Sequence, residues 1–176
     1  MEYKVLIIDF GSQYTQLIAR RVRELNIYCE IYSFDNFPKN ILEFSAVILS
    51  GSPFSVHSKS APNIDITKIK GNLPILGICY GAQLLADSYG GKVGKSSSRE
   101  YGRANLNIKE QDNILFDGVG NNTQVWMSHS DTIKQLPKNS LLLASSNDVE
   151  NVAYRYEENI YCLQFHPEVY HSTEGK

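Results

Sequence analysis

A cysteine stands between a strand-like apolar run and a helix-compatible run, where a sharp turn can expose a nucleophile. Cys79 follows the apolar residues 73–78 and precedes a helical pattern that begins at Tyr80, with Gly77 and Gly81 close on either side. This G-x-C-x-G pattern is typical of a nucleophile elbow, in which small neighbours are needed because larger side chains would clash. The unpaired N–H groups of a helix N-terminus would stabilise negative charge on the sulfur. The pattern predicts nucleophilic catalysis by Cys79, although a buried, inert cysteine at a strand end has the same local sequence.

A second motif supplies a base and a carboxylate. His166 follows an apolar strand-like run, Pro167 fixes the backbone, and Glu168 is close enough to hold the imidazole in one tautomer. Taken alone, His166 could equally cap a strand-end carbonyl, with Glu168 as a solvated charge. Two such motifs at strand ends of one α/β sheet favour a triad. The three side chains lack the clustered spacing of zinc ligands, so we expect no metal here.

The remaining cysteines are expected to be structural. Cys29 and Cys162 lie inside predicted strands, and an odd total of three cysteines argues against a disulfide framework. His171 lies in a polar tail and is expected at the surface.

The elements that must bring the two motifs together alternate between strand and helix in the first half of the chain. Nearly continuous apolar runs predict buried parallel strands, and Ser12 is a candidate N-cap for the first helix. The helix after Cys79 is expected to end in a glycine cap near Gly90 and Gly91. We therefore predict an α/β fold with an open, mostly parallel, doubly wound (flavodoxin-like) sheet and helices on both faces. The expected strands are 3–9, 27–34, 46–49 and 73–78, and the first helix is 13–25.

The second half has shorter strand candidates separated by Asn, Asp, Gly and Ser turns. Residues 96–102 are expected to form a polar loop. The expected strands are 104–109, 123–128, 141–144, 151–156 and 160–165. In the parallel half, the turn 50–53 and Cys79 both follow strand ends, so we expect them on one rim.

Length and charge exclude several functional classes. We expect one domain over residues 1–176, and the net charge of −2 with interspersed signs gives no basic footprint for nucleic acid. Apolar runs are strand-sized and the N-terminus lacks a signal-peptide layout. We expect a cytoplasmic protein without a membrane segment.

Gly77-Ile78-Cys79-Tyr80-Gly81 together with His166-Pro167-Glu168 resembles the class I (triad) glutamine amidotransferases. Residues 8–24 and 125–129 resemble the subfamily of glutaminase domains whose ammonia serves the amination of XMP to GMP in purine biosynthesis. The resemblance covers the whole chain. It implies hydrolysis of glutamine to glutamate and ammonia, without a cofactor in this domain.

The resemblance also implies roles for individual residues. Cys79 would form a γ-glutamyl thioester, His166 would transfer protons, and Glu168 would orient His166. The oxyanion would be held by the N–H groups of Tyr80 and Ser52, and the substrate-binding residues would be Gly51, Gln83, Ser128, His129 and Ser130. Two residues depart from the family pattern, because Ser52 and Ser130 stand where glycine is usual. Ser52 would be strained if its φ were positive.

The partner implied is an ATP pyrophosphatase (synthetase) domain or subunit that uses ATP and Mg²⁺. The sequence has no Ser-Gly-Gly-x-Asp-Ser pyrophosphate loop, so we expect an excised domain of a longer synthase, the alternative being a stand-alone subunit. Two other functions remain open: the glutaminase of another synthetase, such as those for anthranilate or carbamoyl phosphate, and a non-catalytic α/β regulatory module.

Overall fold

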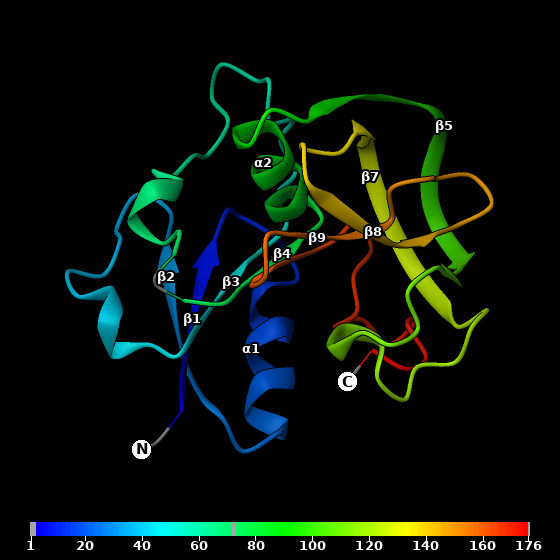
Figure 1. Ribbon diagram of the computed structural model, residues 1–176. Coiled ribbons are helices and arrows are strands. Elements are labelled where there is room, and N and C mark those ends of the chain that lie inside the picture. Colours follow the sequence, from blue (N-terminus) through cyan, green and yellow to red (C-terminus); the bar gives the residue numbers. More distant parts are fainter. Residues whose placement is uncertain (1–2, 72, 176) are drawn as a thin grey trace.

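A mixed β-sheet forms the centre of the protein (Figure 1). The computed structural model describes residues 3–71 and 73–175, with the backbone alone at 97–100. In this part of the chain eight strands form the main sheet in the order β2-β1-β3-β4-β10-β9-β8-β6, and β5 and β7 form a separate pair. The strands are β1 (Lys4–Asp9), β2 (Tyr28–Ser33), β3 (Ala46–Leu49), β4 (Ile75–Ile78), β5 (Lys92–Asn105), β6 (Asn107–Ile108), β7 (Gln124–Gln135), β8 (Ser140–Ser145), β9 (Ala153–Tyr156) and β10 (Ile160–Leu163). The helices are α1 (Thr15–Glu24) and α2 (Tyr80–Ser88), with short 3₁₀ turns at η1 (Ile41–Glu43), η2 (Ile66–Lys68) and η3 (Ile114–Phe116).

The half of the sheet that carries the candidate site is parallel. β2, β1, β3, β4 and β10 pair in parallel, whereas β9, β8 and β6 continue the sheet in antiparallel fashion. β2 and β3 flank β1 on opposite sides, so the strand order reverses between β1 and β3. In open α/β sheets, ligands bind at such a reversal, outside the carboxyl ends of the strands. The predicted α/β fold with a mostly parallel sheet is confirmed.

The two helices cover opposite faces of the sheet. Successive side chains of a strand point to opposite faces, so the contacts of neighbouring β1 residues show which helix lies on which face. Leu6 and Ile8 of β1 pack in the same core cluster as Leu85 of α2, whereas Ile7 packs with Ile18 of α1. The three β1 side chains have no exposed surface. Their burial on both faces explains the uninterrupted apolar run that predicted this strand.

The β5–β7 pair is the largest difference from the sequence-based expectation. The polar loop predicted at 96–102 is wrong, because these residues belong to β5, and β7 continues well beyond residue 128 to Gln135. Among the described strands β5 pairs with β7 alone, with a register irregularity between Lys95 and Glu100. Most of the described β5 side chains are half-buried or exposed, so this strand needs no continuous apolar face, and its serine-rich sequence concealed it. β7 packs Val125 and Met127 into the cluster that contains residues of β10 and β9. Figure 1 shows the β5–β7 pair on the opposite side of the molecule from β1 and β2.

Several element ends also differ from expectation. α1 begins at Thr15 after the N-cap residue Tyr14, and Ser12 Oγ accepts a hydrogen bond from the Tyr14 N–H in the preceding turn instead of capping the helix. The strand expected at 104–109 is divided between β5 and β6, and those expected at 151–156 and 160–165 are shorter. The glycine cap of α2 is confirmed, because Gly90 has a φ of +84° and the Gly91 N–H donates to the Ala86 carbonyl.

No helix in the described residues is long and apolar enough to cross a membrane.

Candidate active site

Cys79 occupies a strained turn between β4 and α2. Its φ is 52° and its ψ is −104°, outside the regions that L-residues usually adopt. The conformation is held from both sides, because the Cys79 N–H donates to the Leu163 carbonyl of β10 and the Cys79 carbonyl accepts from the Gln83 N–H of α2. Strain of this kind persists only where the surroundings impose it, and it is concentrated at functional sites.

The glycines beside Cys79 are required by close backbone contacts. A Cβ at Gly81 would lie 2.5 Å from the Leu49 carbonyl oxygen, and one at Gly77 would lie 2.8 Å from Leu85 Cδ1. Real Cβ atoms essentially never come this close to other heavy atoms, so larger residues would displace α2 from the sheet. The steric reason for the G-x-C-x-G pattern is confirmed.

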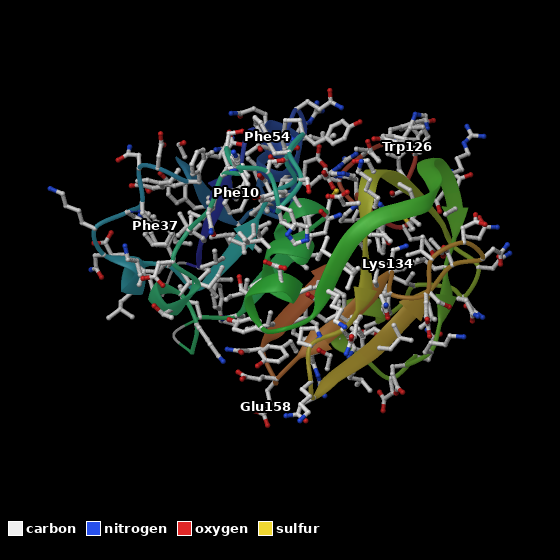
Figure 2. All side chains as sticks on the ribbon, turned by 90° about the horizontal axis from the view of Figure 1, so that it is seen from above. Phe10, Phe37, Phe54, Trp126, Lys134 and Glu158 are labelled. Atoms are coloured by element: carbon white, nitrogen blue, oxygen red, sulfur yellow. The ribbon has the colours of Figure 1, made fainter. Side chains whose placement is uncertain are left out.

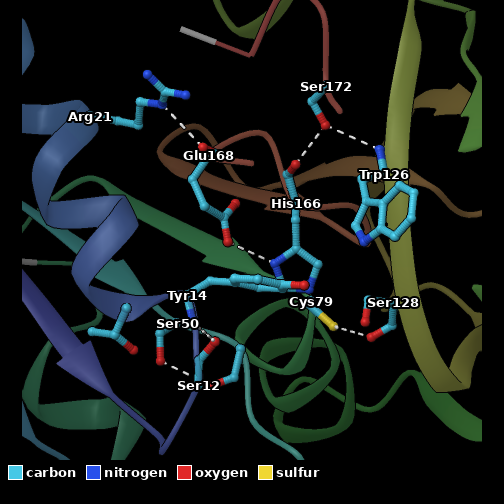
Figure 3. Close-up of polar contacts among 12 residues, drawn as sticks. Ser12, Tyr14, Arg21, Ser50, Cys79, Trp126, Ser128, His166, Glu168 and Ser172 are labelled. Atoms are coloured by element: carbon cyan, nitrogen blue, oxygen red, sulfur yellow. Dashed lines mark hydrogen bonds and ion pairs between the residues drawn. The ribbon is translucent and has the colours of Figure 1, made fainter. Parts of the chain in front are cut away.

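His166 and Glu168 form a buried pair just beyond the end of β10. His166 Nδ1 lies 2.7 Å from Glu168 Oε1, and both side chains are almost wholly buried. In Figure 3 the imidazole lies between Glu168 and the Cys79 sulfur. Burial works to lower the pKa of His166, but the negative charge of the neighbouring Cys79 sulfur, together with Glu168, raises it to about 10. The imidazole of His166 is therefore protonated at pH 7.

Two further groups confine the imidazole. The Tyr14 ring meets it edge-on, with 4.9 Å between the ring centroids. A Cβ at Gly51 would lie 3.2 Å from His166 Cε1, so Gly51 allows the turn after β3 to approach the ring closely.

Cys79 and His166 open into a cavity of about 450 Å³. Five other residues predicted from the sequence line it: Ser52, Gln83, Ser128, His129 and Ser130. The predicted residues Gly51, Tyr80 and Glu168 do not line it. In the described residues no three His, Cys, Asp or Glu side chains are grouped so that they could hold a metal ion.

Tyr80 contributes to the site only through its backbone. Its ring is buried against Phe10, and its hydroxyl donates to the Pro62 carbonyl. Within residues 3–71 and 73–175, the backbone N–H groups of Tyr80 and Ser52 have no hydrogen-bond acceptor. Ser52 is not among the residues with positive φ, so serine causes no backbone strain at this position.

The side chains from α2 and β7 are held by local contacts. Gln83 Nε2 donates to the Asp131 carbonyl at 2.8 Å, and Cys79 Sγ lies 3.8 Å from the Ser128 carbonyl oxygen.

Burial lowers the pKa of His129 to about 4, so this imidazole is neutral at pH 7. Ser130 is exposed at the cavity.

Sequence reasoning missed several residues that line the cavity. Ser12 and Tyr14 follow β1 as Ser52 follows β3, so their position after a strand end could have revealed them. Asp131 directly follows the predicted residues 128–130. Tyr101 reaches the cavity because β5 pairs it with Ser128, a register that the sequence alone does not reveal.

A cysteine, a histidine and a glutamate brought together at the strand ends of an α/β sheet are the parts of a nucleophilic hydrolase site, and comparison with known proteins gives the family. The family model described as glutamine amidotransferase class-I matches residues 6–176, and the chain belongs to this family.

Individual relatives give a narrower comparison than the family model, because each is named as one enzyme. The chain is 60% identical to a GMP synthase [glutamine-hydrolyzing] of Christiangramia forsetii, over 100% of this chain and 35% of that protein. It is 54% identical to GMP synthase [glutamine-hydrolyzing] 1 of Bacteroides thetaiotaomicron, over 99% of this chain and 35% of that protein. The chain thus spans about a third of the length of these relatives.

Two solved structures have the same fold. A crystal structure described as that of a putative GMP synthase subunit from Thermoplasma acidophilum matches with a TM-score of 0.86 and 32% identity, over 99% of this chain and 89% of that one. A glutamine amidotransferase from Thermotoga maritima matches with a TM-score of 0.80 and 25% identity, over 96% of this chain and 77% of that one.

Proposed function

We propose that this chain hydrolyses glutamine to glutamate and ammonia and supplies the ammonia for ATP-dependent amination of XMP to GMP. The proposal of hydrolysis rests on the buried His166–Glu168 pair beside Cys79. Cys79 lies in a strained turn, and Cys79 and His166 line the same cavity. The link to GMP formation rests on the curated relatives that are 50–60% identical over nearly the whole chain.

In the proposed reaction, the Cys79 sulfur attacks the side-chain amide carbon of glutamine, and His166 holds the proton that the thiol has given up. His166 protonates the departing nitrogen, the C–N bond breaks, and ammonia leaves a γ-glutamyl thioester. His166 then takes a proton from water as the water attacks the thioester carbon. The C–S bond breaks, glutamate is released, and the sulfur of Cys79 is free for the next cycle. Glu168 holds the imidazole in the required orientation through Nδ1.

The oxyanion formed in each step would be held by the N–H groups of Tyr80 and Ser52. Both groups are free of acceptors within the described chain, and Tyr80 lies at the N-terminus of α2. The amino-acid end of glutamine would meet Ser128, His129 and Ser130, with Gln83 beside them.

The acceptor of the ammonia would be a synthetase domain or subunit that binds ATP and Mg²⁺, and the proposed hydrolysis itself needs no cofactor. Both parts would act in the cytoplasm. Because ammonia released without an acceptor is lost, we expect glutamine hydrolysis by this chain alone to be slow and to increase when the synthetase is present.

The experiment measures glutamate formation by the purified chain, alone and with the synthetase part of the Christiangramia forsetii enzyme. The synthetase component for anthranilate serves as the alternative partner. Faster hydrolysis with the first partner only, abolished by Cys79→Ala, supports the whole proposal. Faster hydrolysis with the second partner only would assign the glutaminase to another pathway, and no hydrolysis under any condition would favour a non-catalytic module.

A further inference from the structure

The turn that carries His166 is attached to β7 through one hydroxyl group. The His166 N–H donates directly to the Trp126 carbonyl at 2.9 Å. The reverse hydrogen bond, from the Trp126 N–H to the His166 carbonyl, is not made directly. The Trp126 N–H donates to Ser172 Oγ at 3.1 Å, and Ser172 Oγ donates to the His166 carbonyl at 2.6 Å (Figure 3).

Ser172 therefore occupies the place of a backbone hydrogen bond. Two residues that face each other in an antiparallel pair normally exchange two N–H···O bonds. Here one bond is made and the other is spaced by a hydroxyl, which acts as donor and acceptor at once. Ser172 is 7% exposed, so water has little access to replace its hydroxyl.

We propose that Ser172 is a positioning residue for His166, whose hydroxyl sets the peptide of His166 at the distance from β7 that places the imidazole beside Cys79. This inference rests on the proposed glutaminase function, because it concerns the same imidazole. The Ser172 hydroxyl bonds to the His166 backbone and acts on the imidazole only through it.

Replacement of the hydroxyl by a methyl group, as in valine, leaves the Trp126 N–H and the His166 carbonyl without their partner. A methyl group cannot approach a carbonyl oxygen as closely as the 2.6 Å of the hydroxyl hydrogen bond. The His166 peptide would therefore move away from Ser172. Because Glu168 is only two residues further on, the imidazole and its carboxylate would shift relative to the sulfur together.

The sharpest comparison is between Ser172→Thr and Ser172→Val, since threonine and valine have the same shape and only threonine keeps the hydroxyl. We expect Ser172→Thr to retain activity close to that of the parent. We expect Ser172→Val to lower kcat by roughly 10²-fold, the effect of a displacement of about 1 Å at a reacting group. KM should change little, because Ser172 does not line the substrate cavity.

Thr173→Val is the matched control in the same segment. Its hydroxyl donates to the Gln124 carbonyl at 3.4 Å at the exposed surface. This variant loses a hydroxyl hydrogen bond to β7 without touching His166, so we expect its kcat and KM to equal those of the parent.

A second readout separates positioning from general loss of structure. The imidazole NMR signals of His166, assigned by their absence in His166→Gln, should shift in Ser172→Val and return in Ser172→Thr. The signals of His57, whose ring lies 3.0 Å from the Val93 carbonyl oxygen, should stay unchanged in both. If Ser172→Val gives a folded protein with parental kcat and parental His166 signals, the inference is overturned.

The same set of variants distinguishes this inference from the proposed function. Parental kcat in Ser172→Val, with Cys79→Ala inactive, would refute the role of Ser172 and leave the glutaminase intact. Undiminished hydrolysis in Cys79→Ala would refute the glutaminase mechanism itself. If Ser172→Val and Ser172→Thr lose kcat equally, the hydroxyl is not what positions His166, and the inference also fails.

Discussion

Glu168 Oε1 lies 2.7 Å from His166 Nδ1, although the two residues are separated by only one proline. The turn brings the carboxylate back onto the ring, and both side chains are buried. The other carboxylate oxygen, Oε2, has no hydrogen-bond partner in the described part of the chain. Within the described residues, the hydrogen bond of the Glu168 side chain is therefore made to the His166 imidazole.

Glu168→Gln should impair glutamine hydrolysis without abolishing it. The amide keeps the shape of the side chain and loses the charge that favours the imidazolium, so we expect kcat to fall by about 10²-fold. Cys79→Ala should reduce hydrolysis to background because no thioester can form. The assay is glutamate production at saturating glutamine. Glu158→Gln, at an exposed position labelled in Figure 2, is the control and should equal the parent. Equal losses in Glu168→Gln and Glu158→Gln would contradict the role of Glu168.

Cys79→Ala should lower the pKa of His166. In the parent, burial lowers this pKa, while the Cys79 sulfur and Glu168 raise it to about 10. Without the sulfur, burial and Glu168 remain, so the imidazole should lose its proton at lower pH. The measurement is an NMR titration of the His166 imidazole in both proteins. An identical titration midpoint would show that the sulfur and the ring do not interact.

The free energy of unfolding should depend on pH in the way that the raised pKa of His166 predicts. Its pKa of about 10 in the folded protein exceeds the value near 6.5 of an ordinary histidine. Its contribution to the free energy of unfolding is therefore fully present below about pH 6.5 and lost as the pH rises toward 10. Urea unfolding of the parent and of His166→Gln should give a stability difference that decreases over this range. A difference that is constant or increases with pH would contradict the raised pKa.

Gly81→Ala should destabilise the fold at the elbow. Its Cβ would lie 2.5 Å from the Leu49 carbonyl oxygen, a backbone atom that cannot move without shifting β3. We expect a loss of about 2–3 kcal/mol in the free energy of unfolding. Gly94→Ala is the matched control, because the nearest atom to its Cβ would be 3.9 Å away on a flexible lysine. Similar stability in the two variants would show that the elbow is not sterically constrained.

Much of the parallel half of the fold could be predicted from the sequence. Runs such as residues 5–8 are apolar throughout because both faces of the sheet are covered, and this pattern is local. The position of Cys79 between two glycines also depends on local geometry, and the structure shows the close contacts that require them.

The β5–β7 pair could not be predicted, because it is determined by contacts between distant segments. Residues 100–105 of β5 take their register from pairing with β7, and no periodicity in the sequence indicates it. The same is true of Tyr101, which reaches the cavity through its partner Ser128. The hydroxyl bridge from Ser172 to His166 and Trp126 likewise joins segments 46 residues apart.

The most direct test of the account is the reaction of the chain with a glutamine-like electrophile, followed by mass spectrometry of its peptides. Cys29 and Cys162 are internal controls for Cys79, since all three cysteines are buried. Burial raises the pKa of Cys29, and it raises the pKa of Cys162 to about 12, so neither should react. We predict one label per chain, on Cys79, and none in Cys79→Ala. A label on Cys29 or Cys162, or no label at all, would contradict the assignment of Cys79 as the nucleophile.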